Sequence, residues 1–407
     1  MTAEWREIRF RDVTGAHGLF SDGDWIETKD QDPEGDARLI QLADIGDGEY
    51  LDRSSRFLTM QKAAELKCTF LKSGDLLVAR MPDPLGRACV FPGDQRPSVA
   101  AVDICIIRPD TLAVDVQWLK WAVNAPVFRS QIARYVSGTT RERISRKNLE
   151  KLPLRLPSLP EQRRIAAILD KADAVRRKRR ETLDLADQFL RSAFLDMFGD
   201  PVTNPKGWPV RKLLEAFVTD RSPTKCGPFG SALRKEEYAE TGIPVLTMDN
   251  IVGNSFALEG CLFVTREKWE VLSQYEVQEG DIIISRAGTV GKMCEVPRLG
   301  MPAIISTNLI RLSLNPQVLD PAYFVALMTY CRGRMGILRA GADGSYSFMN
   351  TGILRDLRVP FPSQDGQARW RHLVVTMRSG MSRLLLNYAT LEALSNSLLR
   401  SAFRGRP

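Results

Sequence analysis

The feature that most constrains this chain is a repeat of itself at an offset of about half its 407 residues. The segment Ser73-Gly-Asp-Leu-Leu-Val-Ala-Arg80 recurs as Glu279-Gly-Asp-Ile-Ile-Ile-Ser-Arg286. Three further landmarks recur in the same order and at a similar offset, namely Trp5 and Trp208, Leu156-Pro-Ser158 and Phe361-Pro-Ser363, and Leu190–Phe194 and Leu399–Phe403. Because the residues between these landmarks differ, we expect two halves that share a scaffold but not a surface.

A long helix is predicted at the end of each half, over about 159–198 and 364–403. In the first, Ser158 and Glu161 form a capping box, and apolar residues follow at the spacing of one helix face. The second helix has the same apolar spacing, but Gly366 replaces the glutamate, so we expect a poorer cap. Each helix would be about 60 Å long. A stripe of that length favours antiparallel packing of the two helices as a coiled coil, and the alternative is that each packs on its own globular domain.

The remaining segments predict a mixed α/β fold that is present twice. Both Gly-Asp segments are typical of a turn that enters a buried strand. Further elements are expected in matching order, with strands over 101–107 and 307–312 and helices over 116–123 and 323–330. We therefore divide the chain into a domain, a helix, a second domain and a second helix, over 1–156, 157–200, 201–361 and 362–407. A pseudo-twofold axis would relate the two domains.

The sequence lacks the motifs of the common catalytic classes. It has no G-x-x-x-x-G-K-[ST] loop for ATP hydrolysis and no N-P-P-[YF] tetrapeptide of amino-methyltransferases. Its two histidines and seven scattered cysteines predict neither a zinc site nor a disulfide framework. We therefore expect no catalytic residue and no metal. No apolar run reaches the roughly 20 residues of a membrane helix and no signal core opens the chain, so we expect a cytoplasmic protein.

The formal charge of +8 and the pI of about 9.2 favour an acidic partner, most commonly nucleic acid. Two loops lie in matching places before the strand that leads into each long helix. They supply candidate contacts to DNA bases or phosphates, which are Thr139, Thr140, Arg141, Arg143 and Ser145 in the first loop and Ser345, Tyr346 and Ser347 in the second. Arg80 and Arg286, which end the repeated Gly-Asp segment, are candidates as well. The alternative is that these loops are ordinary polar turns.

Five consecutive cations interrupt the apolar stripe of the first helix, namely Arg176, Arg177, Lys178, Arg179 and Arg180. From Glu161 to Glu181 this helix carries eight Lys and Arg against four Asp and Glu, a net charge of +4. This basic run is a candidate contact for the DNA backbone or for an acidic partner protein, and the alternative is a solvated charge cluster.

In its motifs and their order the chain resembles the specificity subunits of Type I restriction–modification systems. The resemblance rests on the Gly-Asp segments of both halves, on S-G-T-x-x-x-x-I-S at 137–145, on L-P-x-L-P-E-Q-x-x-I at 156–165 and on Phe194–Pro201. It covers essentially the whole chain. It implies two target-recognition domains that each bind one half of a split double-stranded DNA sequence, with two helices that fix the spacing between them.

The resemblance also implies partners and cofactors outside this chain, in a phage-defence system. Two modification subunits, which methylate adenine with S-adenosylmethionine, would dock on this scaffold, and restriction subunits that use ATP and Mg²⁺ would add to that core. The chain itself would bind no cofactor. Two other interpretations stay open, a divergent stand-alone DNA methyltransferase or nuclease and a coiled-coil scaffold that binds only proteins. The second helix departs from the family pattern, because S-Q-D-G-Q replaces S-L-P-E-Q at its start.

Overall fold

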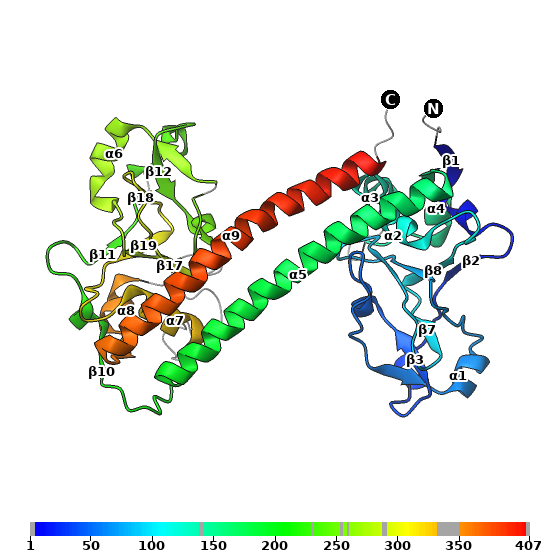
Figure 1. The fold of residues 1–407 in the computed structure, drawn as a ribbon, viewed down its shortest axis with the longest axis horizontal. Helices are drawn as coiled ribbons and strands as arrows, with labels where there is room; N and C mark the ends of the chain where they lie inside the picture. Colours follow the sequence, from blue (N-terminus) through cyan, green and yellow to red (C-terminus); the bar gives the residue numbers. More distant parts are fainter. Residues whose placement is uncertain are drawn as a thin grey trace. The chain divides into compact units, whose positions relative to one another are not determined.

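The computed structural model describes residues 5–137, 142–229, 232–252, 255–258, 260–286, 291–331 and 350–403, and within 381–403 the side chains of Ser397, Leu399 and Phe403. By its internal contacts the chain divides into two compact units (Figure 1). Unit 1 holds Met1–Arg180 with Leu385–Pro407, and unit 2 holds Glu181–Leu384. The finer domain boundaries expected from the sequence stay a prediction.

Unit 1 is built on a four-stranded and a three-stranded sheet. The first has the order β2-β8-β5-β6 with antiparallel neighbours, and the second has the order β4-β3-β7, in which β3 and β7 are parallel. The antiparallel pair β1-β9 stands apart from both sheets. The elements are β1 (Arg6–Arg9), β2 (Leu19–Asp22), β3 (Ala37–Ile40), β4 (Arg56–Leu58), α1 (Met60–Glu65), β5 (Leu76–Ala79), β6 (Ala88–Val90), β7 (Ser98–Ala100), β8 (Ile104–Arg108), α2 (Val116–Asn124), α3 (Pro126–Ala133), α4 (Arg146–Lys151), β9 (Pro153–Leu156) and the long helix α5 (Leu159–Phe198).

Unit 2 repeats this topology. Its sheets have the orders β11-β19-β16-β17 and β15-β12-β18, with the pair β10-β20, and it adds a short hairpin, β13-β14. The elements are β10 (Val210–Lys212), β11 (Thr224–Cys226), β12 (Ile243–Leu246), β13 (Ile251–Val252), β14 (Ser255–Phe256), β15 (Leu262–Val264), α6 (Arg266–Leu272), β16 (Ile282–Ser285), β17 (Met293–Glu295), β18 (Ile304–Ile305), β19 (Leu309–Leu312), α7 (Pro321–Cys331), α8 (Thr351–Asp356), β20 (Arg358–Pro360) and the long helix α9 (Gln364–Phe403).

The strand register shows which residues of the two units are equivalent. Leu76 pairs with Ile107 as Ile282 pairs with Leu312. The mixed α/β fold and the internal repeat expected from the sequence are therefore confirmed, and so are the bounds of both long helices. The strand expected from residue 101 begins only at Ile104, because the two residues before it form a turn.

The repeated Gly-Asp segment forms the turn before a strand of the four-stranded sheet in each unit and supplies a buried ion pair there. Gly74 and Gly280 have φ values of 91° and 84°, which favour glycine at this turn. The aspartates that follow are almost fully buried, and each forms an ion pair with an arginine from another segment, Asp75 with Arg108 and Asp281 with Arg221. Because a buried carboxylate needs such a partner, these aspartates belong to the scaffold.

A buried glutamine fixes the start of each long helix. The side-chain oxygen of Gln162 accepts a hydrogen bond from the backbone N–H of Asp115 at 2.8 Å, and its amide nitrogen donates to two backbone carbonyls. Gln367 accepts from the N–H of Asp320 at 2.7 Å in the same way. Asp115 caps α2, and Asp320 lies just before α7. Each glutamine therefore joins a long helix to the first helix that follows the sheet of its own unit.

The caps of the long helices differ from the expected capping box. The Glu161 carboxylate accepts two hydrogen bonds of 2.7 Å from Arg164. At the start of α9 the Ser363 hydroxyl accepts from the N–H of Gly366 at 3.3 Å. The second helix therefore keeps the serine half of the box, although it lacks the glutamate.

Within each unit the end of one long helix packs with the start of the other. In unit 2, residues from the end of α5 and the start of α9 share one core, which includes Leu190, Phe194, Phe198, Trp370 and Val374. In unit 1, the end of α9 packs through Leu399 and Phe403 against the core that holds Ile165 and Leu169 of α5. In each unit the end of one long helix thus meets the start of the other, and the coiled coil expected between their middle parts stays a prediction. Both helices also pack on the α/β bodies, which is the alternative that the apolar stripe left open.

Candidate nucleic-acid interface

The first candidate loop is anchored at one end of the four-stranded sheet of unit 1. Ser137 and Arg143 close the loop with two backbone hydrogen bonds of 3.0 Å, and the N–H of Ile144 donates to the carbonyl of Arg80 at 3.1 Å. Because Arg80 directly follows β5, the base of the loop is tied to the end of a buried strand. Six candidates lie outside the described residues and stay predictions, namely Thr139, Thr140, Arg141, Ser345, Tyr346 and Ser347.

The side chains of Arg80 and Ser145 have partners within unit 1. The side chain of Arg80 is 5% exposed, pairs with Asp22 at 3.2 Å and donates to the carbonyl of Val102. Burial lowers the pKa of its guanidinium, but arginine remains protonated in proteins. The Ser145 hydroxyl caps α4 by accepting from the N–H of Asn148 at 3.2 Å. Both side chains are therefore engaged within unit 1, next to the described ends of the loop.

Arg143 and Arg146 present guanidinium groups at the surface of the same sheet end. The side chain of Arg143 is 40% exposed and pairs with Asp103 at 3.1 Å. That of Arg146 is 38% exposed and lies 3.6 Å from Asp22. Partly exposed ion pairs contribute under about 1 kcal/mol. Either arginine can therefore exchange its carboxylate for a DNA phosphate or a guanine edge at little cost in stability.

The equivalent sheet end of unit 2 carries different side chains. Arg80 and Arg286 occupy equivalent positions, because each donates its backbone N–H to the carbonyl of the residue just before the neighbouring strand. These residues are Asp103 before β8, at 2.9 Å, and Asn308 before β19, at 3.0 Å. Strand register places Cys226 where unit 1 has Asp22, so the carboxylate that pairs with Arg80 has no counterpart at this position of unit 2. The guanidinium of Arg286 lies 4.6 Å from the centre of the Phe229 ring. The two units thus present different chemistry on one scaffold.

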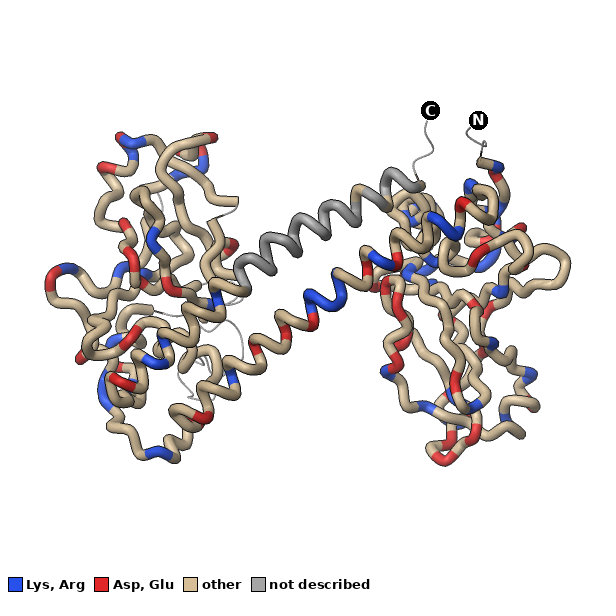
Figure 2. The backbone as a smooth tube through the Cα atoms, in the orientation of Figure 1, with Lys and Arg blue, Asp and Glu red and all other residues tan. Residues whose placement is uncertain are grey.

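The basic run of α5 is partly neutralised close to its own helix. Asp173 is buried and pairs with Arg176 at 2.6 Å and with Arg177 at 3.0 Å. Arg177 also pairs with Glu49 at 3.3 Å. Figure 2 shows the run as a blue stretch in the middle of α5. The segment Glu161–Glu181 nevertheless has a net charge of +4, which suits a phosphate backbone.

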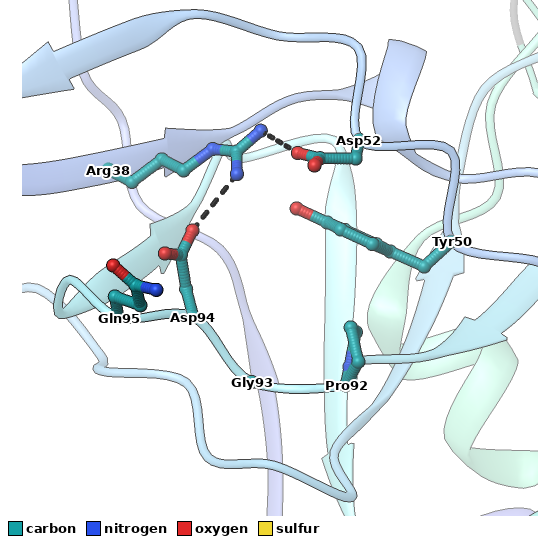
Figure 3. A pocket seen from close by; sticks show the side chains of 7 residues that line it. All are labelled: Arg38, Tyr50, Asp52, Pro92, Gly93, Asp94 and Gln95. Atoms are coloured by element: carbon teal, nitrogen blue, oxygen red, sulfur yellow. Dashed lines mark hydrogen bonds and ion pairs between the residues drawn. The ribbon is translucent and has the colours of Figure 1, made fainter.

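A hollow on the surface of unit 1 is unsuited to a nucleic-acid backbone. It has a volume of about 590 Å³ and is lined by Arg38, Tyr50, Asp52, Pro92, Gly93, Asp94 and Gln95 (Figure 3). Arg38 pairs with Asp94 at 2.9 Å and with Asp52, so two carboxylates neutralise one guanidinium. Burial raises the pKa of the Tyr50 hydroxyl, which therefore stays protonated. The hollow is an ion-paired joint between β3 and the loop that follows β6.

The described part of the chain contains no group of three or more His, Cys, Asp or Glu side chains that could hold a metal ion. All seven cysteines are free thiols. Among the helices of the described residues, none is long and apolar enough to cross a membrane.

Comparison with known proteins agrees with this fold. Residues 4–184 match the Type I restriction modification DNA specificity domain. The Type I restriction enzyme MjaVIII specificity subunit of Methanocaldococcus jannaschii is 23% identical over 248 residues, which span 56% of this chain and 56% of that protein. The alignment thus spans about half the length of this curated relative.

A solved structure extends the likeness in fold to almost the whole chain. The S subunit of a Type I restriction-modification system from M. genitalium has a TM-score of 0.61, covering 99% of this chain and 97% of that one at 17% identity. At this identity the likeness concerns the fold. Residues 4–184 thus match a Type I restriction modification DNA specificity domain, and the chain is similar in sequence to one specificity subunit and in fold to another.

Proposed function

We propose that this chain selects the DNA target of a Type I restriction–modification complex by recognising a bipartite double-stranded site. The observation that carries the proposal is the repeat, in which one sheet topology occurs twice with different side chains at the same sheet end. Base edges specify a sequence, so two unlike surfaces on one scaffold suit two unlike half-sites. Each α/β body would recognise one half.

At the two sheet ends, Arg143 and Arg286 would contact DNA, because a guanidinium can donate two hydrogen bonds to a guanine edge or a phosphate. Arg80 and Ser145 would position the first loop, since both side chains are engaged within unit 1. The rest of the two loops would complete the contacts through Thr139, Thr140, Arg141, Ser345, Tyr346 and Ser347. The basic run of α5 would contact the phosphate backbone.

The two long helices would set the spacing between the half-sites and bind the modification subunits. Large apolar residues of α5 are exposed and offer a surface for this contact, namely Ile168, Val175, Leu185 and Phe189. The relative from M. jannaschii is named a specificity subunit of a restriction enzyme, which supports a partnership with catalytic subunits. In the cytoplasm, two adenine-methylating subunits and the restriction subunits would bind S-adenosylmethionine, ATP and Mg²⁺, and this chain would perform no catalysis.

The proposal is tested with the tagged full chain, isolated from its native host and then separated from its partners. We expect the chain with its partners to transfer methyl groups from labelled S-adenosylmethionine to duplex DNA, and the chain alone to transfer none. We also expect binding of duplex DNA to weaken steeply as salt rises, because phosphate contacts release counterions. Methyl transfer by the chain alone, or absence of DNA binding by the chain and by its complex, would contradict the proposal.

A further inference from the structure

Two exposed aromatic residues occupy equivalent positions in the two units. Trp25 of unit 1 is 68% exposed and Phe229 of unit 2 is 56% exposed. Gly23 continues β2 and donates its N–H to the first residue of β8 at 2.8 Å, and Gly227 continues β11 and donates to the first residue of β19 at 2.9 Å. In both units the aromatic residue follows this glycine by two positions.

The two glycines fix the point at which the aromatic residues leave the sheet. A Cβ atom on Gly23 would lie 2.2 Å from the carbonyl oxygen of Ala101, and one on Gly227 would lie 1.9 Å from that of Ser306. Both separations are far below van der Waals contact, so each position requires glycine. The aromatic residues therefore stand at a fixed place on the scaffold, next to the strands β7 and β18.

Both aromatic residues follow the strand at the sheet end that carries the candidate arginines. Trp25 comes three residues after Asp22, which pairs with Arg80 and lies 3.6 Å from Arg146. In unit 2 the pairing is direct, because the guanidinium of Arg286 lies 4.6 Å from the Phe229 ring. An exposed aromatic ring at one register position of each unit, at the sheet end that carries arginines, fits a ligand that offers apolar groups next to anionic ones. Duplex DNA has this chemistry, with thymine methyl groups and base edges beside phosphates.

We propose that Trp25 and Phe229 are equivalent specificity-determining residues, each of which makes an apolar contact with bases of its own half-site. The inference rests on the proposed function and deepens it, because neither residue belongs to the loops at 137–145 and 341–349. The Trp25 indole N–H donates to the Glu27 carboxylate at 3.3 Å, and this contact limits the motion of the ring before DNA is bound.

The test is selection of bound sequences from a pool of randomised duplex DNA by the full chain, isolated with its native partners. We expect the wild type to select a two-part site, Trp25→Ala to lose base preference in one part, and Phe229→Ala to lose it in the other. Affinity for the wild-type site should fall about tenfold in each variant. Trp25→Phe keeps an aromatic ring and should retain most of the preference. Leu112→Ala and Val271→Ala, at positions 88% and 71% exposed, are the matched controls and should select the wild-type site.

The outcomes separate this inference from the proposed function. If the wild type selects a two-part site and both alanine variants select the same site, the inference is overturned and the proposed function stands. A uniform loss of affinity with unchanged base preference also overturns it. If the wild type selects no sequence at all, the proposed function fails and the inference fails with it. Unchanged thermal unfolding of the alanine variants is expected, because both rings are exposed.

Discussion

Replacing Gln162 by leucine removes three hydrogen bonds from the joint between α5 and α2. The Gln162 side chain is fully buried, accepts from the N–H of Asp115 at 2.8 Å, and donates to the carbonyls of Ala113 and Pro157 at 3.0 and 2.9 Å. Leucine is close in size, so the substitution leaves three backbone groups without partners rather than a large cavity. At about 1 kcal/mol for each lost bond, unit 1 should lose about 3 kcal/mol of unfolding free energy.

Hydrogen exchange followed by mass spectrometry measures this loss separately in the two units. Buried strands such as β5 exchange when unit 1 opens, so a loss of that size predicts about 100-fold faster exchange there. The equivalent strand β16 of unit 2 should keep its rate. Gln188→Leu is the matched control, because Gln188 is exposed on the same helix. If exchange became less than about fivefold faster in unit 1, or equally faster in both units, the Gln162 bonds would not stabilise the joint between α5 and α2.

Three further predictions use related measurements. Gln367→Leu removes the hydrogen bonds of Gln367 to Asp320 and Pro362, so unit 2 should lose about 2 kcal/mol of unfolding free energy. Hydrogen exchange should therefore be faster in unit 2 and unchanged in unit 1. Gly227→Ala should destabilise unit 2 by more than about 2 kcal/mol in urea unfolding, because its Cβ would lie 1.9 Å from a carbonyl oxygen. The control Gly380→Ala meets nothing within 4 Å in α9 and should stabilise the chain by up to about 1 kcal/mol. Phe189→Asp, at a residue 51% exposed, should abolish co-purification of the modification subunits without changing exchange in either unit, and continued co-purification would show that this face of α5 is not the joint.

Local patterns in the sequence predicted the repeated elements of the fold. Both long helices have the expected bounds, because apolar spacing is a signal carried by neighbouring residues. The same stripe gave a less accurate account of the docking surface. The stripe includes Leu190, which is buried in the core of unit 2 and offers no surface to a partner. An acidic residue at Leu190 would unfold that core, so exposed Phe189 is the better position for the test.

For the candidate DNA contacts, the sequence does not predict which side chains are buried and which are exposed. Arg80 and Arg143 are equally basic in the sequence, but Arg80 is buried against Asp22 and Arg143 is 40% exposed, and only long-range packing makes this difference. Trp25 and Phe229 had a visible signal, because the Gly-x-aromatic triplets recur at an offset close to that of the other landmarks. What the sequence could not provide was their exposure, which separates a surface contact from an ordinary core aromatic.

If two different surfaces of one chain recognise two halves of one DNA site, each surface should determine the bases of its own half. Sequencing can map the methylated adenines in the genome of the native host, in cells that carry the wild type, Arg143→Ala or Arg286→Ala. We expect a two-part methylated motif for the wild type, relaxed in one part by Arg143→Ala and in the other part by Arg286→Ala. A motif that both variants relax at the same bases, or that persists when the chain is deleted, would contradict this expectation.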